Sequence, residues 1–287
     1  MSRVAYVNGR FVRHAEASVH IEDRGYQFAD GVYEVWAVFE GQLADSPGHF
    51  ERLERSLGEL GIAMPMSRAA LAVVLAETVR RNRIRGGIVY LQITRGVAPR
   101  DHAFPAHPVR PSIVITAKTV DWAAAQAKAA QGVSVVTTPE TRWARCDIKS
   151  VALLPNVLAK QAARKEGAYE AWFVDELGLV TEGSSSNAWI VDQDGVLRTR
   201  DLNANILRGI TRSSLIGLIA EAGLQLSERP FTPEEAKSAR EAFVTAASTL
   251  VMPVVKVDGA IIGDGKPGPV ALRLRALYLS HAQTKGG

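Results

Sequence analysis

The chemistry suggested by this sequence begins at Lys149, which ends an extended stretch, residues 142–149, directly before a predicted helix. Apolar residues at helical spacing follow it, namely Leu153, Leu154, Val157, Leu158 and Ala162, and Gly167 stands where a C-terminal cap would. The aliphatic neighbours Ile148 and Val151 would exclude water from the Lys149 amine inside a cleft. Because desolvation favours the neutral amine, Lys149 is a candidate to attack a carbonyl or to hold an aldehyde as a Schiff base. Most lysines are solvated surface residues, so this pattern alone is weak evidence.

A second polar stretch, residues 181–187, lies between two predicted strands. It contains the carboxylate of Glu182, then a glycine and three serines. This order suits a carboxylate that faces a cationic ring nitrogen, with small hydroxyl residues that let a flat ligand approach the backbone. A polar surface loop would have almost the same composition, so both interpretations stay open on composition alone.

An anion site is predicted where residues 209–211 begin a helix, because Ile210 and Thr211 offer backbone N–H groups and a hydroxyl there. Arg52, on another predicted helix, would add a bidentate contact. A lysine for an aldehyde, a carboxylate for a ring nitrogen and a helix N-terminus for a phosphate are together what pyridoxal phosphate requires.

Length and composition indicate an ordinary globular protein of two domains. The chain has 287 residues, of which 47% are hydrophobic and 22% charged, enough to bury one large core or two smaller ones. The Ala-rich stretch 118–132 breaks the pattern of elements, so we expect an N-terminal small domain over 1–119 and a C-terminal cofactor-binding domain over 120–287.

Charge and cysteine content exclude several classes of function. The net charge is +4, and the densest basic run, residues 80–85, falls at a predicted helix end, where it complements the helix dipole better than it suits nucleic acid. The single cysteine, Cys146, excludes an internal disulfide framework and suits a reducing compartment, and no HxxH or CxxC pair indicates a metal site. With no signal peptide and no apolar stretch long enough to cross a membrane, we expect a cytoplasmic protein.

Strands and helices mix in both halves, which predicts an α+β protein. Asn8 and Gly9 between two apolar runs predict a β-hairpin at the start. A Pro-bounded loop after the strand 88–94 carries Arg100 and His102, two potential anion binders. Other predicted strands lie at 31–38, 112–116, 169–174, 188–191, 196–197 and 243–245, and helices lie around 53–60, 71–79, 209–223 and from 232 onward.

Six blocks of the sequence resemble the fold-type IV pyridoxal phosphate enzymes and, within them, the bacterial D-amino acid (D-alanine) aminotransferases. The blocks are residues 22–28, 30–34, 146–150, 157–161, 181–187 and 209–212. The resemblance extends from Asn8 to about Gly268. It implies a two-domain fold with a smaller N-terminal α/β domain and a larger, mixed and barrel-like C-terminal domain. It also implies a homodimer with the active site near the subunit interface.

The resemblance implies a role for each candidate residue. Lys149 would form the Schiff base and carry the proton, and Glu182 would pair with the pyridinium nitrogen. The other positions fall into three groups: Arg52, Ile210 and Thr211 for the phosphate, Leu207 against the cofactor ring, and Tyr33, Arg100 and His102 for the substrate α-carboxylate.

One departure from the family pattern concerns the phosphate. Where close relatives carry hydroxyl residues after the Phe-Val-Thr strand, this chain has Ala246 and Ala247. Their backbone N–H groups would have to bind the phosphate unless Ser248 or Thr249 supplies a hydroxyl.

The activity implied is transamination between D-amino acids of the D-alanine and D-glutamate type and 2-oxo acids. Alternatives on the same fold are a branched-chain L-amino acid aminotransferase, an (R)-amine transaminase and, less in keeping with the sequence, an aminodeoxychorismate lyase. Residues 100–102 argue against each. A hypothesis of another class, an inactive vitamin-binding scaffold, would need neither Lys149 nor the carboxylate-binding residues.

Overall fold

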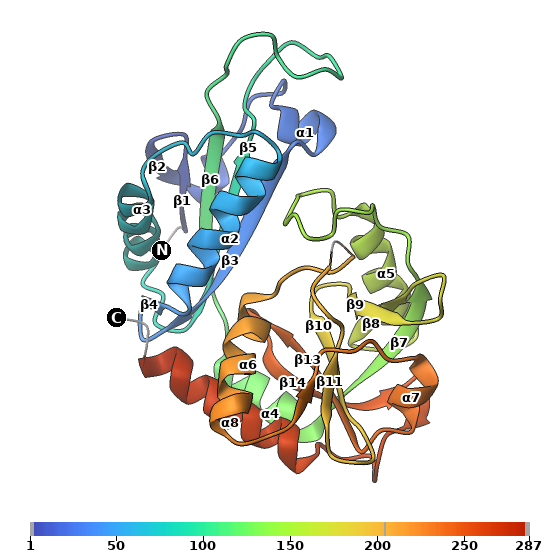
Figure 1. Ribbon diagram of the computed structural model, residues 1–287. Coiled ribbons are helices and arrows are strands. Elements are labelled where there is room, and N and C mark those ends of the chain that lie inside the picture. Colours follow the sequence, from blue (N-terminus) through green and yellow to red (C-terminus); the bar gives the residue numbers. More distant parts are fainter. Residues whose placement is uncertain (1–2, 204, 285–287) are drawn as a thin grey trace. The chain divides into compact units, whose positions relative to one another are not determined.

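The computed structural model describes residues 3–203 and 205–284 and divides into two compact units (Figure 1). The first unit contains the described chain up to Asp121, the segment Ile148–Ala152 and residues 283–284. The second contains Trp122–Asp147 and Leu153–Ala282. The segment with Lys149 therefore groups with the first unit, although it lies beyond residue 119 in the sequence. The domain division at residues 119 and 120 stays a prediction.

The first unit is built on a six-stranded antiparallel sheet with the order β2-β1-β6-β5-β3-β4. Its strands are β1 (Val4–Val7), β2 (Arg10–Arg13), β3 (Gly31–Phe39), β4 (Gln42–Leu43), β5 (Gly87–Thr94) and β6 (Ser112–Thr119). Its helices are η1 (His14–Glu16), α1 (Arg24–Phe28), α2 (Ser46–Glu59) and α3 (Arg68–Arg81). The predicted hairpin is confirmed, since Asn8 and Gly9 join β1 to β2 with φ values of 47° and 99°.

Helix α1 is an element that the sequence does not predict. It is only five residues long, too short for an apolar period to show. Asp23 caps it by accepting a hydrogen bond from the Gly25 N–H. Ala29 ends it in the left-handed region, and β3 begins two residues later.

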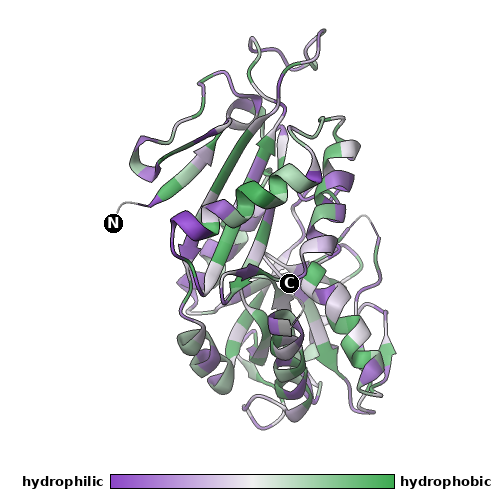
Figure 2. Cartoon of the chain, turned by 90° about the vertical axis from the view of Figure 1, so that its left-hand side faces the viewer, coloured by the Kyte–Doolittle hydropathy of each residue, from purple (hydrophilic) through white to green (hydrophobic). Residues whose placement is uncertain are grey.

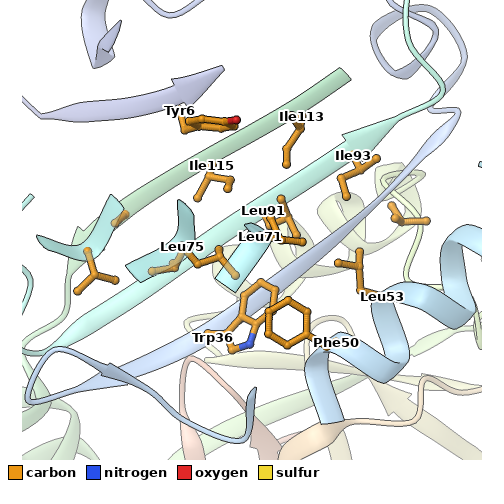
Figure 3. Close-up of a cluster of buried hydrophobic side chains, with 14 of the residues drawn as sticks. Tyr6, Trp36, Phe50, Leu53, Leu71, Leu75, Leu91, Ile93, Ile113 and Ile115 are labelled. Carbon is orange, nitrogen blue, oxygen red and sulfur yellow. The ribbon is translucent and has the colours of Figure 1, made fainter. Parts of the chain in front are cut away.

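The core of the first unit is packed from the sheet, α2 and α3 (Figure 3). Trp36 of β3 lies against Phe50 of α2, with ring centroids 5.7 Å apart. Leu71 and Leu75 of α3 join the same cluster. Ile148, next to the candidate lysine, is also a buried member, so it fastens the Lys149 segment to this unit by hydrophobic contact.

The second unit is built on a nine-stranded mixed sheet with the order β12-β11-β10-β13-β14-β7-β8-β9, and β15 pairs with β14. Its strands are β7 (Val133–Pro139), β8 (Glu170–Val174), β9 (Val180–Gly183), β10 (Asn187–Val191), β11 (Leu197–Thr199), β12 (Leu226–Ser227), β13 (Glu241–Ala246), β14 (Leu250–Val257) and β15 (Ala260–Ile261). Its helices are α4 (Trp122–Gln131), α5 (Leu154–Lys165), α6 (Ile210–Glu221), α7 (Pro233–Lys237) and α8 (Pro269–Thr284). The sheet curls, because β9 also contacts β10. The mixed, barrel-like architecture expected for this part of the chain is confirmed.

Two helices of the second unit differ from the sequence pattern. The Ala-rich stretch 118–132, expected to break the pattern of elements, contains α4, because alanine has a high helix propensity even without a wide apolar face. Helix α5 forms after Lys149 as predicted, but its inner face is Ala159 and Ala163. Leu154, Val157 and Leu158 are exposed.

Hydrophobic residues are concentrated in the two sheets (Figure 2). Hydrophobic residues dominate the strands, and the helices carry both hydrophobic and hydrophilic residues. In the part of the chain that the structure describes, no helix combines the length and apolar character needed to cross a membrane.

Candidate active site

Backbone hydrogen bonds attach the Lys149 segment to the edge of β3. The Tyr33 N–H donates to the Lys149 carbonyl at 3.0 Å, and the Val151 N–H donates to the Gly31 carbonyl at 3.0 Å. On the other side, the Lys149 N–H donates to the Ser56 hydroxyl of α2 at 3.3 Å. The backbone of the candidate nucleophile is thus held by a strand and a helix of one unit.

The Lys149 side chain is half-buried over an aromatic ring. Its amine lies 4.2 Å from the ring centre of Tyr33, and Tyr33 stacks on Tyr90 with centroids 5.7 Å apart. Burial, together with the neighbouring Tyr33, raises the pKa of Tyr90 to about 12, so its phenol stays neutral. The structure therefore brings together two of the predicted site residues, Lys149 and Tyr33.

Arg52, predicted to bind phosphate, is held by a buried carboxylate one residue beyond Tyr33. Its Nε and Nη2 donate to the two oxygens of Glu34 at 2.7 and 2.8 Å, and His49 Nδ1 lies 2.7 Å from Glu34 Oε2. Burial alone would raise the pKa of Glu34, but the Arg52 charge and hydrogen bonds lower it to about 2. Burial lowers the pKa of His49, although the neighbouring Glu34 opposes this effect. At neutral pH, therefore, Glu34 and Arg52 form an ion pair and the His49 imidazole beside them is neutral.

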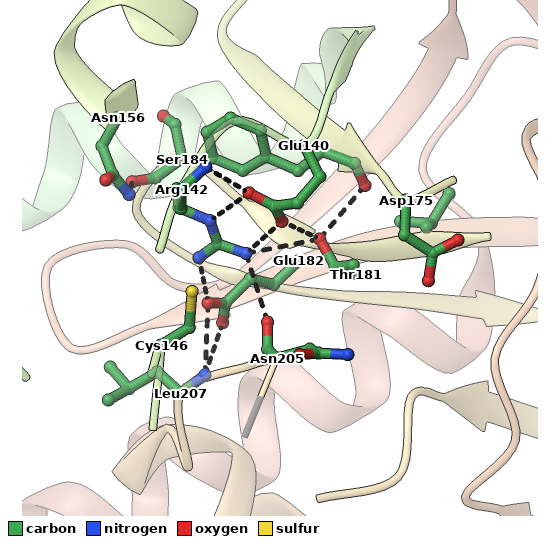
Figure 4. Close-up of polar contacts among 12 residues, drawn as sticks. Glu140, Arg142, Cys146, Asn156, Asp175, Thr181, Glu182, Ser184, Asn205 and Leu207 are labelled. Atoms are coloured by element: carbon green, nitrogen blue, oxygen red, sulfur yellow. Dashed lines mark hydrogen bonds and ion pairs between the residues drawn. The ribbon is translucent and has the colours of Figure 1, made fainter. Parts of the chain in front are cut away.

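Glu182, at the end of β9, is the centre of the polar cluster in the second unit (Figure 4). The Leu207 N–H lies 3.1 Å from both carboxylate oxygens, and the Asn187 amide donates to Oε2 at 3.0 Å. Arg142 Nη1 donates to Oε1 at 2.5 Å. These donors fix the orientation of a carboxylate that is only 5% exposed.

Arg142 and Glu140 are site residues that the sequence does not single out. Arg142 stands in the stretch 142–150, but a single arginine there resembles any surface cation. In the structure its side chain is 6% exposed and it also binds Glu140, with Nε to Oε1 at 2.9 Å and Nη2 to Oε2 at 2.6 Å. Glu140 and Arg142 follow β7, whereas Glu182 lies on β9. The sheet brings these side chains together, because β7 and β9 are the two neighbours of β8.

The three serines after Glu182 have a structural use in addition to the one predicted. Ser184, Ser185 and Ser186 all donate their hydroxyls to Glu170, a buried carboxylate at the start of β8. Lys160 adds an ion pair at 3.3 Å. Their small size and hydroxyls therefore stabilise a buried charge, and the resulting tight loop orients Glu182.

The N-terminus of α6 lies close to Glu182 through Asn187. The Asn187 amide also donates to the Leu207 carbonyl at 3.0 Å, and a Cβ on Gly209 would meet the Asn187 Oδ1 at 2.0 Å. Among the described residues no side chain caps α6, whose first residues Ile210 and Thr211 are buried. The first N–H groups of a helix have no partner within the helix, so this end is suited to an anion.

Ala246 and Ala247 lie next to the strand residue that pairs with Asn187. Asn187 pairs with Thr245 in the sheet, and the next residues are Ala246, at the end of β13, and Ala247, both only partly buried. Of the two hydroxyls named as substitutes, Ser248 is exposed. The Thr249 hydroxyl is buried without a hydrogen-bond partner in residues 3–203 and 205–284, which leaves it able to bind a ligand oxygen.

Arg100 and His102 lie exposed in the loop between β5 and β6 of the first unit. Both face the ring of Phe28, the Arg100 guanidinium at 5.0 Å and the His102 ring at 5.4 Å from its centroid. The buried Arg24 holds this loop, because it donates to the Asp101 carbonyl at 2.6 Å and is paired with Asp30 at 2.8 Å. A guanidinium and an imidazole are thus presented together on a supported loop.

The donor set of the second unit suits pyridoxal phosphate. Glu182 offers a fixed carboxylate to a protonated ring nitrogen, and the uncapped start of α6 with the Thr249 hydroxyl suits a phosphate. In the first unit Lys149 offers the amine that an aldehyde requires.

Comparison with known proteins defines the class. A family model described as amino-transferase class IV matches residues 31–257. The chain belongs to this family of aminotransferases, and its fold-type IV architecture is confirmed.

Individual relatives refine the comparison. A D-alanine aminotransferase of Bacillus licheniformis is 43% identical over 263 residues, covering 92% of this chain and 91% of that protein. Another from Staphylococcus aureus (strain N315) is 42% identical over 271 residues, 94% of each chain. Among solved structures, the branched-chain aminotransferase of the thermophilic archaeon Thermoproteus uzoniensis, determined with norvaline, is 26% identical. Its TM-score is 0.85 over 99% of this chain and 97% of that chain.

The buried ion pair of Glu34 predicts an acid-sensitive fold. Because its pKa falls from 4.5 to about 2 on folding, the unfolded chain binds more protons between these values, and stability is lost as pH falls from about 4.5 towards 2. The contribution at neutral pH is on the order of 3 kcal/mol. Denaturant unfolding at a series of pH values should show a shallower loss of stability in acid for Glu34→Gln than for the wild type.

Glu77→Gln is the matched control, because Glu77 also pairs with two arginines, Arg80 and Arg81, but both of these arginines are exposed. Solvent screens such pairs, so its acid profile should follow the wild type. Parallel profiles for Glu34→Gln and the wild type would show that Glu34 has no such role.

Proposed function

We propose that this chain is a pyridoxal phosphate-dependent aminotransferase that moves the amino group between D-amino acids, of the D-alanine and D-glutamate type, and 2-oxo acids. Membership of the class IV aminotransferases supports the reaction, and the D-alanine aminotransferases at 42–43% identity support the substrate class. The observation that carries the proposal is the exposed pair Arg100 and His102, presented together on a supported loop of the first unit.

In this proposal each residue acts through its own chemistry. Lys149 would supply the amine that holds the cofactor aldehyde and, once the substrate amine has displaced it, would take the proton from the substrate Cα and return it at C4′. The cofactor ring supplies a sink for the electron pair left at Cα. Glu182 keeps the ring nitrogen protonated, and Leu207 packs against the ring.

Three segments of the chain are assigned to the phosphate. Ile210 and Thr211 offer the N–H groups of α6, and the Thr211 hydroxyl, 3.4 Å from the Tyr278 hydroxyl, is already oriented. Arg52 is assigned to the phosphate by family resemblance, with Glu34 fixing its guanidinium. Ala246 and Ala247 contribute backbone N–H groups, and the buried Thr249 hydroxyl replaces the hydroxyls that relatives carry there.

Handedness follows from where the carboxylate is held. Lys149 reaches only one face of the bound substrate, so the Cα proton has to point towards it. The carboxylate and the side chain then occupy opposite sides, and the side with cations selects the enantiomer. We assign the carboxylate to Arg100, His102 and the Tyr33 hydroxyl, whose charge-assisted hydrogen bonds are worth about 1.5–3 kcal/mol each.

The alternative on the same fold is a branched-chain amino acid aminotransferase, the activity named for the Thermoproteus uzoniensis structural neighbour. Its lower identity of 26%, against 42–43% for the D-alanine enzymes, favours the D-amino acid proposal. A panel of D- and L-amino acids with 2-oxoglutarate and pyruvate decides between them.

We further propose a cytoplasmic homodimer, as family resemblance implies. The exposed side chains of Leu154, Val157 and Leu158 on α5 support an association, because contiguous apolar surface is costly to leave in water. Sedimentation equilibrium of the purified holoenzyme measures the subunit number directly.

Replacing Lys149 with Ala should leave a folded protein that binds the cofactor without a covalent bond. Transamination should fall by several powers of ten, because one residue forms the bond and moves the proton. Borohydride reduction followed by peptide mapping checks this. If the variant still acquires cofactor at residues 142–164, Lys149 is not the attachment site.

Replacing Arg100 with Ala should lower kcat/KM for D-alanine about 10- to 100-fold, mainly through KM, and reduce the preference for D over L. The resting absorption spectrum and thermal stability should stay unchanged, since Arg100 is exposed. Arg110→Ala, an exposed arginine at the other end of the same loop, is the control. Full D-selectivity with an ordinary KM in Arg100→Ala would place the carboxylate elsewhere and reopen the branched-chain alternative.

A further inference from the structure

One guanidinium in the second unit joins two carboxylates (Figure 4). Arg142 contacts Glu182 Oε1 through Nη1 at 2.5 Å and both oxygens of Glu140 through Nε and Nη2. The side chains of Arg142 and Glu182 are each 6% exposed, and that of Glu140 is 19% exposed. The Thr181 hydroxyl donates to Glu140 Oε2 at 2.8 Å and fixes the far carboxylate as well.

The contacts between Glu140 and Arg142 determine the charge state of both side chains. Burial alone would raise the pKa of Glu140, but the Arg142 hydrogen bonds and charge lower it. Burial would lower the pKa of Arg142, yet the hydrogen bond to Glu140 and the charges of Glu182 and Glu140 raise it. Both groups are therefore charged at neutral pH.

The neighbouring thiol does not change this balance. Burial raises the pKa of Cys146 to about 12, with Glu182, Glu140 and Asp147 adding to the effect and Arg142 opposing it. Its Sγ donates to the Trp143 carbonyl at 3.1 Å. Cys146 thus stays neutral, and Asp147 is paired with Arg145 at 2.9 Å.

We propose that Arg142 and Glu140 are positioning residues that set how strongly Glu182 attracts a proton on the cofactor ring nitrogen. Arg142 orients the carboxylate, and Glu140 offsets the positive charge that Arg142 brings. This inference rests on the proposed function for the cofactor and adds the control of its basicity.

The sign of each effect follows from Coulomb's law. The positive charge of Arg142 alone would disfavour a protonated ring nitrogen nearby. The negative charge of Glu140 offsets it, so that the attraction between Glu182 and the protonated nitrogen is kept. With the formal charges of Glu140, Arg142 and Glu182, the wild-type sum is −1. It becomes 0 in Glu140→Gln, −2 in Arg142→Gln and −1 again in the double variant.

The experiment is a double-variant cycle read by nitrogen NMR. Each holoenzyme is loaded with pyridoxal phosphate labelled with ¹⁵N in the ring, and the ¹⁵N shift is followed against pH. In Glu140→Gln the ring nitrogen should lose its proton about one to two pH units lower than in the wild type, and in Arg142→Gln higher. The double variant should return towards the wild-type midpoint.

A kinetic readout accompanies the spectrum. Single-turnover Cα proton removal should slow about tenfold or more in Glu140→Gln. The reason is that a shift of one pH unit in the midpoint of the ring-nitrogen titration is a tenfold change in its protonation equilibrium. The double variant should recover part of that rate. KM for the amino acid should change little, since these residues do not hold the substrate carboxylate.

Asp175→Asn is the matched control, a carboxylate of the same unit paired with Arg200 at 2.7 Å. It should lose stability without moving the ¹⁵N midpoint. Equal midpoints in Glu140→Gln and the wild type, or shifts of the same sign in both single variants, would overturn the proposal. Should Arg142→Gln not fold, the midpoint of Glu140→Gln alone decides. The spectrum is recorded without substrate, so a failed D-amino acid assignment leaves this test intact.

Discussion

A carboxylate that is removed from water has to be surrounded by donors, and this constraint organises both halves of the protein. Glu182 meets it with one guanidinium, one side-chain amide and one backbone N–H. The amide belongs to Asn187, which also bonds to Leu207 and touches Gly209 at the start of α6. The donors to one carboxylate thereby place strand β10, the loop with Leu207 and the start of α6 in fixed positions around it.

Two other buried glutamates meet the same constraint differently. Glu34 is neutralised by Arg52 next to a neutral His49, and it belongs to β3, the strand to which the Lys149 segment is hydrogen-bonded. Glu170 receives three serine hydroxyls and a half-exposed lysine, and it forms the tight loop after Glu182. Charge pairing in this protein therefore serves orientation as much as stability, as expected where a few polar groups have to be held rigidly.

Much of this arrangement was predictable from local sequence signals. The Asn8-Gly9 hairpin, helices α2, α3 and α6 and the capping box of α7 follow from turn chemistry and helical period. The position of Lys149 ahead of α5 also follows from the sequence, but the extended stretch expected at residues 142–149 is wrong, because the structure has bends and turns there. The roles proposed for Glu182, Tyr33, Arg100 and His102 come from family resemblance and not from these local signals.

The remainder depends on contacts between distant parts of the chain. The partner of the three serines, Glu170, is 14 to 16 residues away, and Arg142 is 40 residues from Glu182. No spacing rule links such pairs, because sheet topology decides them. The apolar spacing of α5 indicated the helix but not its buried face, since Ala159 and Ala163 fit the narrow space against Phe173 where leucines would not.

The central claim is that the Glu182 carboxylate, held by its three donors, meets a ring nitrogen while Lys149 binds the aldehyde. It is tested most directly by loading the apoprotein with 1-deazapyridoxal 5'-phosphate, in which carbon replaces that nitrogen. Lys149 should still be fixed to this analogue by borohydride, because its aldehyde is unchanged, whereas the half-reaction with D-alanine should fall by several powers of ten. A half-reaction as fast as with pyridoxal phosphate would contradict the account, because the Glu182 cluster would then have no part in the chemistry.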